Sequence, residues 1–179
     1  MIIMLKKLIL GVSILLGALS TSNVSYSAGK NQNNGKSLLE NERELGRLVD
    51  DFSVLADKKD AHSQTFLFTE NATVEIVRDG KVSLKLTGRK EIGDTFNKTL
   101  NSYDTVYHFN GQKVFDIQGN KATGIVYCMT VLIGKNDKGQ LIKNTMGVRY
   151  NDEYVYENGK WLISKRTSNF DWRTSEEMK

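Results

Sequence analysis

Residues 159–172 read GKWLISKRTSNFDW and contain one long run of β-type sequence that follows a tight Asn158-Gly159 turn. Three adjacent apolar residues, Trp161-Leu162-Ile163, begin the run and Phe170 and Trp172 lie near its end, which suits a long strand that must bury one face. A strand of this length needs other strands beside it and a layer of side chains against its buried face. The rest of the chain must supply those partners.

Three further strands are predicted directly upstream of residue 159. Their predicted ranges are Thr105–Gln118, Lys121–Lys135 and Leu141–Glu157, with the last strand at Lys160–Trp172. The turns between them fall at 119–120, 136–139 and 158–159, and each contains the Gly or Asn that tight turns require. Short connections make all four strands antiparallel, and strands this long twist and curl.

The N-terminal half is predicted to be mainly helical. Ser37 and Glu40 have the spacing of a capping box, and apolar residues at three- and four-residue spacing predict a helix from Ser37 to about Lys58. A short helix is predicted at 61–68, a hairpin with strands at 72–77 and 82–86 follows, and a third helix begins at Gly88 with Thr87 as its N-cap. This order predicts an α+β fold in which about three N-terminal helices pack on one face of a strongly curved, mainly antiparallel sheet.

The first 36 residues are predicted to lie outside this domain. Lys6 and Lys7, then an apolar run, then small residues form the pattern of a secretory signal peptide at 1–27. The polar, Gly- and Asn-rich residues 28–36 are predicted to be a disordered leader, and 37–179 a single domain. We therefore expect an exported protein, periplasmic or secreted and bacterial, with no membrane span after cleavage of the signal.

Composition excludes several functions. The formal charge of +4 includes Lys6 and Lys7, so the domain has an ordinary surface charge and no nucleic-acid partner is expected. His62, His108 and Cys128 are too few and too scattered for a zinc site, and Gly-rich nucleotide motifs are absent from the sequence. We therefore predict no metal and no cofactor. Cys128 is expected to be a small buried hydrophobic residue.

Four local patterns in their order resemble the SnoaL-like branch of the nuclear transport factor 2-like superfamily. They are LADKKD at 55–60, FLFTENAT at 66–73, GRKEI at 88–92, and GKWLI at 159–163 followed by FDW at 170–172. The resemblance extends from about residue 39 to residue 172. It implies a cone-shaped half-barrel with helices on the concave face of the sheet, a deep pocket between the two layers, and often a homodimer formed through the sheet.

The resemblance also implies a pair of candidate catalytic residues. Dehydratases of this superfamily place a histidine on the first strand after the third helix and an aspartate at the end of the first helix, and His108 and Asp57 match these positions. A carboxylate hydrogen-bonded to one ring nitrogen fixes the tautomer and leaves the other nitrogen to transfer a proton. A carboxylate is unfavourable at a helix C-terminus, so the position of Asp57 favours a role other than helix stabilisation.

This sequence departs from the dehydratase pattern at two positions. The tyrosines of those enzymes are replaced here by Phe52 on the first helix and by Ile76 on the first strand. Tyr107 and Tyr127 are the candidates to supply hydroxyls in their place, with packing of both rings as the alternative. Phe52, Tyr107, Tyr127 and Arg166 are the predicted ligand contacts.

The role of the two arginines in the strands depends on which face of the sheet each occupies. Arg149 and Arg166 would bind an oxyanion from the concave face and would be ordinary surface charges on the convex face. Strict alternation puts Trp161 and Ile163 on one face and Arg166 on the other, and does not decide which face is inside. We predict Arg166 at the rim of the pocket.

Three functions fit these observations. The first is a domain that binds a small apolar molecule between sheet and helices. The second is a cofactor-free lyase or isomerase that acts on a hydrophobic hydroxylated or keto compound, such as a steroid or polyketide. The third is an envelope assembly module that acts through its sheet surface. An open pocket with His108 facing inward against Asp57 favours the second, whereas a filled pocket and an apolar convex face favour the third.

Overall fold

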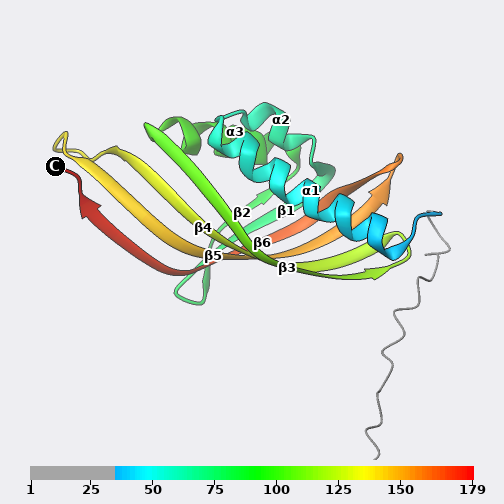
Figure 1. Ribbon diagram of the computed structural model, residues 1–179. Helices are drawn as coiled ribbons and strands as arrows, with labels where there is room; N and C mark the ends of the chain where they lie inside the picture. The colour runs from blue at the N-terminus through cyan, green and yellow to red at the C-terminus, as the bar shows by residue number, and fades with distance from the viewer. Residues whose placement is uncertain (1–34) are drawn as a thin grey trace, which may run out of the picture.

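The computed structural model describes residues 35–179, in which helices cover the concave face of one curved sheet (Figure 1). The predicted signal peptide and most of the predicted leader lie outside the described residues. The described part contains the elements α1 (Leu38–Asp57), α2 (Ala61–Thr65), β1 (Phe68–Arg78), β2 (Lys81–Thr87), α3 (Arg89–Asn101), β3 (Thr105–Gln118), β4 (Lys121–Lys135), β5 (Leu141–Glu157) and β6 (Lys160–Glu177). Among residues 35–179, no helix is long and apolar enough to cross a membrane.

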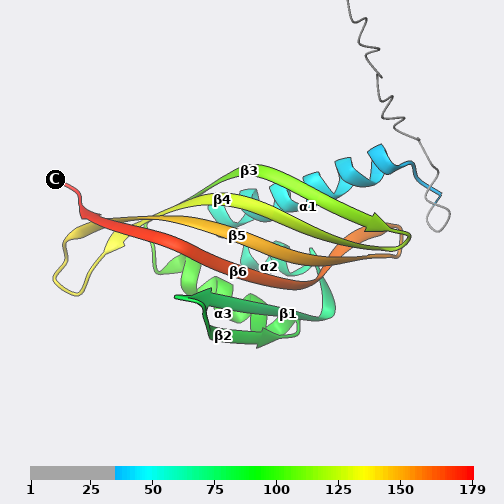
Figure 2. The ribbon, with the colours of Figure 1, turned by 90° about the horizontal axis from the view of Figure 1, so that it is seen from below.

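The six strands form one mixed sheet in the order β2-β1-β6-β5-β4-β3, seen from its outer side in Figure 2. All neighbours are antiparallel except β1 and β6, which run parallel. The β1–β2 hairpin precedes the four-strand meander in the chain and pairs in the sheet with the last strand of that meander, β6. This pairing is the parallel one. The α+β fold and the mainly antiparallel curved sheet that the sequence predicted are confirmed, and the sheet is not closed into a barrel.

At most boundaries the structure contains the helix caps and turns that the sequence predicts. The Ser37 amide donates to Glu40 Oε2 at 2.7 Å and the Glu40 amide donates to Ser37 Oγ at 3.2 Å, which completes the capping box. Asn158 and Gly159 have φ of 51° and 80°, the positive values that a tight type I′ turn demands. Lys36, assigned to the leader, pairs with Glu44 of α1.

Three predicted boundaries are wrong. Phe68 begins β1 instead of ending α2. The N-cap of α3 is Gly88, and the Thr87 amide instead donates to Glu91 Oε2 at 2.7 Å. Strand β6 continues past Trp172 to Glu177 because β5 offers it a partner as far as Ile142, which pairs with Glu177.

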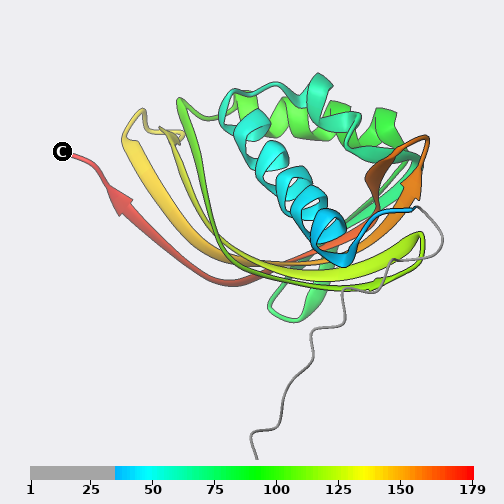
Figure 3. The same ribbon diagram turned by 45° about the vertical axis from the view of Figure 1, so that its right-hand side comes forward.

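The core lies between α1 and the middle of the sheet, where Figure 3 shows α1 lying along the hollow of the sheet. Leu45, Val49 and Phe52 on one face of α1 pack against residues such as Val126 and Val148 of the sheet, and all are buried. Trp161 donates from Nε1 to the buried Asn41 Oδ1 at 2.9 Å, which fixes α1 to the start of β6. The sheet extends well beyond the helices on the side of the β4–β5 turn, so only part of its concave face is covered (Figure 1).

Candidate functional site

A cavity of about 190 Å³ lies between the sheet and the helices, beside the C-terminal end of α1. Its wall is mostly apolar, with a few polar side chains that come from both layers. The lining residues are Phe52, Ala56, Gln64, Ile76, Arg78, Leu84, Leu86, Thr95, Phe96, Thr99, Leu100, Tyr103, His108, Thr130, Leu132, Met146, Tyr150, Arg166, Ser168 and Phe170. Each of the described helices and strands contributes at least one of them, so this cavity is a product of the whole fold.

His108 and Asp57 meet at the wall of this cavity. His108 Nδ1 lies 2.8 Å from Asp57 Oδ1, and the side chains are 9% and 27% exposed. Asp57 is the last residue of α1 and His108 is near the start of β3, so the packing of helix on strand brings them together. The carboxylate accepts from Nδ1–H, which leaves Nε2 as the nitrogen that can accept a proton.

The helix end is held in place by bonds that do not involve His108. Ser53 Oγ donates to Asn110 Oδ1 at 3.1 Å, and Asn110 Nδ2 donates to Asp50 Oδ1 at 3.0 Å. Gln64 Nε2 donates to the Phe52 carbonyl at 2.9 Å and ties α2 to α1. Because α1 is fixed to β3 one turn before Asp57, the carboxylate is presented to the imidazole in one orientation.

Arg166 lies at the floor of the cavity instead of at its rim. It is fully buried, with Nε 2.8 Å from Asp152 Oδ1 and Nη2 2.6 Å from Asp152 Oδ2. Its guanidinium carbon is 4.1 Å from the ring centroid of Phe52 and 4.2 Å from that of Tyr150. Burial alone would lower the pKa of Arg166, but the charge and hydrogen bonds of the facing Asp152 carboxylate, with the neighbouring tyrosines, keep that pKa above its usual value.

A β-bulge explains why strict alternation failed for Arg166. The register of β5 against β6 shifts between Glu153 and Tyr154, so that Ser164 is an extra residue on β6. Trp161 and Ile163 before the bulge and Arg166 after it therefore all point inward, where alternation had placed them on opposite faces.

Two buried polar atoms at this site have no hydrogen-bond partner among the described residues. They are Nη1 of Arg166 and Oε1 of Gln64. Unpaired buried polar atoms are rare in folded proteins because each loses its bonds to water. Both residues line the cavity, Arg166 from β6 and Gln64 from α2, so its wall contains one donor and one acceptor without a partner among the described residues.

The tyrosines at the cavity are not the predicted ones. Tyr107 and Tyr127 are 55% and 47% exposed and lie on the convex face, so their predicted place in the pocket is wrong. Tyr107 is the neighbour of His108 on one strand, and neighbours on a strand point to opposite faces. Tyr103 and Tyr150 line the cavity instead. Burial raises the pKa of Tyr150, so its hydroxyl stays protonated.

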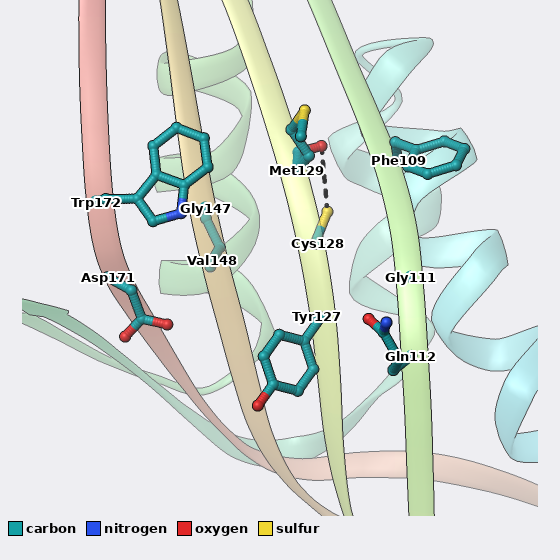
Figure 4. Close-up of a pocket in the computed structure, with 10 residues that line it drawn as sticks. All are labelled: Phe109, Gly111, Gln112, Tyr127, Cys128, Met129, Gly147, Val148, Asp171 and Trp172. Carbon is teal, nitrogen blue, oxygen red and sulfur yellow. Dashed lines mark hydrogen bonds between the residues drawn. The ribbon is translucent and has the colours of Figure 1, made fainter.

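The convex face carries a separate groove of about 320 Å³, which contains Tyr127 (Figure 4). Its apolar side chains are Phe109, Met129, Trp172 and Tyr127, with Asp171 at one end. Gly147 makes room for the indole, since a Cβ at 147 would clash with Trp172. Arg149 also faces outward, where its Nε and Nη2 donate to Asp171 at 2.6 and 2.8 Å.

Cys128 is buried in β4, as expected, and burial raises the pKa of its thiol. A raised pKa leaves little thiolate near neutral pH, so the thiol is not a candidate nucleophile. No cluster of His, Cys, Asp and Glu suited to a metal ion occurs within the described range 35–179.

The sequence matches a known family, and the fold is similar to that of many solved structures. A family profile described as "SnoaL-like domain" matches residues 37–167. A search of curated proteins found no match. Many solved structures are similar in fold, and three of them illustrate the likeness.

The first is a candidate scytalone dehydratase from Novosphingobium aromaticivorans, with 18% identity over 79% of this chain and 91% of that chain and a TM-score of 0.68. The second is hexachlorocyclohexane dehydrochlorinase LinA-type3 from Novosphingobium barchaimii, with 18% identity over 77% and 91% and a TM-score of 0.64. The third is a variant of the Mycobacterium tuberculosis protein Rv3472, of unknown function, with 18% identity over 74% and 73% and a TM-score of 0.63. At this identity the likeness concerns the fold.

Proposed function

Because this chain belongs to the SnoaL-like family, we propose that it is a cofactor-independent lyase that eliminates water or another small leaving group from a small apolar molecule. The observation that carries this proposal is the 2.8 Å contact between His108 Nδ1 and Asp57 Oδ1 at the wall of an apolar cavity. Structures of similar fold are named for a dehydratase and a dehydrochlorinase, and both names denote eliminations.

The proposed step uses one base and balances within the substrate. His108 Nε2 takes a proton from a substrate carbon, and the electrons of that C–H bond form a C=C bond to the neighbouring carbon. The leaving group departs from that neighbour with its bonding electrons, and a leaving hydroxide takes the proton back from the imidazolium as water. Asp57 stabilises the imidazolium and holds its orientation.

The surroundings of His108 support elimination in a shielded site. The wall is mostly apolar, so proton transfer occurs away from bulk water, where electrostatic interactions are stronger. Tyr150 lines the cavity and is kept protonated by burial, and we propose its hydroxyl as the donor to a substrate oxygen. It takes the place of the hydroxyls that Phe52 and Ile76 lack.

The second candidate is a binding domain without catalysis, and the absence of tyrosines at positions 52 and 76 favours it. Turnover separates the two candidates. We would screen small β-hydroxy and β-chloro compounds with the wild type and with H108A. The lyase proposal expects alkene formation that falls at least about 100-fold in H108A, in the range of general acid–base contributions. Equal turnover in H108A would overturn the acid–base role.

We also propose a homodimer formed through the convex face. Tyr107, Phe109, Met129 and Trp172 are between 46% and 63% exposed there. Aromatic and methionine side chains that gather on one sheet face are typical of interface cores, and a monomer rarely exposes such a patch. A second copy presents the same patch, so the contact can close with twofold symmetry. Sedimentation equilibrium should give a dimer that dissociates in F109D.

Export remains a proposal based on residues 1–27. Secretion assays with and without these residues would test it, since export should require them.

A further inference from the structure

Arg78 is the inward-facing cation at the end of the cavity opposite to His108. It is the last residue of β1 and follows Val74 and Ile76 on the same face of that strand. In the register of β1 against β6 it pairs with Phe170, and its guanidinium lies 5.0 Å from the centroid of that ring. Both residues line the cavity.

The charges around the cavity are unbalanced at this end. The lining residues include two arginines and one histidine but no carboxylate. Arg166 is matched by Asp152 and His108 is bonded to Asp57. Arg78 has no ion pair with any residue in the range 35–179, and its side chain is solvent-exposed at the mouth. The cavity therefore favours a ligand that brings one negative charge to Arg78.

The strand order sets the separation between Arg78 and His108. From β1 to β3 there are four steps between neighbours, β1-β6-β5-β4-β3. At about 4.8 Å per step the two backbones are roughly 19 Å apart along the sheet, and the inward side chains shorten the gap between their tips. A ligand that reaches both side chains is elongated.

The cavity volume limits the bulk of this ligand. A cavity of about 150 Å³ holds one benzene molecule, and the cavity here has about 190 Å³. This space suits one six-membered ring with a short chain.

We propose that the ligand of this cavity is a monocarboxylic acid with a single ring, whose carboxylate binds Arg78 at the mouth and whose ring lies toward His108. The inference rests on the proposed small-molecule function of the cavity and names its ligand class. A guanidinium presents two parallel N–H donors to a carboxylate, and one unpaired cation matches a monoanion. Arg78 would thus position the reacting end of the ligand at a fixed distance from the mouth.

The test compares two probes that share a phenylbutyl skeleton and differ in the end group, which is a carboxylate in one and a neutral alcohol in the other. Binding of 4-phenylbutyrate and of 4-phenylbutan-1-ol is measured by NMR titration with the purified wild type, R78Q and K81Q. Lys81 follows the same β1–β2 turn, is exposed and does not line the cavity, so K81Q removes the same charge from the same hairpin. We expect the wild type and K81Q to bind the acid about five- to tenfold more tightly than the alcohol, as one charge-assisted contact allows.

In R78Q the two probes should bind equally, with the affinity for the alcohol unchanged, and high salt should reduce the preference of the wild type. Equal binding of both probes by the wild type would overturn the carboxylate assignment and leave small-molecule binding in place. An acid preference that persists in R78Q would overturn the role of Arg78. If neither probe shifts the signals of cavity residues, both this inference and the proposed small-molecule function are overturned.

Discussion

His108 Nδ1 lies 2.8 Å from Asp57 Oδ1, so the end of the first helix and the start of the third strand meet at one hydrogen bond. These residues are far apart in sequence, and the bond forms only when helix α1 is seated on the sheet. The contact sets the tautomer of the imidazole, and this tautomer is open to direct measurement without a known substrate.

We expect the neutral His108 ring to carry its proton on Nδ1, because the Asp57 carboxylate accepts from that nitrogen. In free histidine the Nε2–H tautomer is the commoner, so D57A should move the ring toward it. Long-range ¹H–¹⁵N spectra of imidazole-labelled protein measure the two forms. His62, which lies on α2 away from the cavity, provides the internal control and should not change.

The buried ion pair of Arg166 with Asp152 predicts a large loss of stability in R166M. Removing one partner leaves the Asp152 carboxylate buried without its cation, which costs about 3–5 kcal/mol of unfolding free energy. Urea denaturation followed by circular dichroism measures the change. The matched control is R149M, which breaks an ion pair of similar geometry with Asp171 on the exposed face.

The exposed control should lose far less stability than R166M, because solvent screens surface pairs. The double variant D152L/R166M should recover part of the stability that R166M loses, since no buried charge remains. Equal losses in R166M and R149M would contradict the assignment of Arg166 to a desolvated site.

Tyr150 and Tyr154 predict that the protein loses stability in alkaline solution. Burial raises the pKa of both hydroxyls above the ordinary value of 10.0. In the unfolded chain these groups ionise above about pH 10, while in the folded state they remain neutral, so their contribution to the unfolding free energy is constant below that pH and falls above it. Each group contributes a slope of about 1.4 kcal/mol per pH unit.

Urea denaturation between pH 8 and pH 11.5 tests this expectation. Y150F should have a shallower slope than the wild type by about that amount, whereas Y107F, which alters an exposed ring, should keep the wild-type slope. A slope that is the same in Y150F and in the wild type would refute the burial of this hydroxyl.

The close approach of Trp172 to Gly147 predicts that a larger residue at position 147 disturbs the convex face. A Cβ at this position would clash with the Trp172 indole, so G147A should displace the ring and increase its quenching by acrylamide. If the proposed dimer is formed through this face, its dissociation constant should rise as well. The control is G111A on the same face, where the nearest atom to an added Cβ is 3.7 Å away and neither property should change.

Much of the fold follows from sequence because its signals are local. The bounds of β3, β4 and β5 agree with the predicted ranges, since each strand is followed by a tight turn that contains a residue with positive φ. The prediction that Asp57 and His108 form a pair came from the resemblance to a family, because no local pattern links a helix end to a strand 51 residues later.

The errors at the site have physical reasons. Tyr107 could have been excluded by alternation from His108 alone, once His108 was placed inside. Arg166 could not have been placed, since the bulge at Ser164 reverses the faces of β6 and no turn residue marks it. Arg78 was missed although it shares its strand face with Val74 and Ile76, because an arginine beside a turn resembles a surface charge.

The central claim is that His108 removes a proton from a carbon of a molecule bound in the cavity, and isotope exchange tests it most directly. A substrate found in the screen is incubated in D₂O with the wild type or with H108Q, and the unreacted substrate is recovered for mass spectrometry. The account predicts deuterium at the reacting carbon with the wild type and, in H108Q, a loss of exchange of at least about 100-fold while the substrate still binds. Exchange at the wild-type rate in H108Q would contradict it.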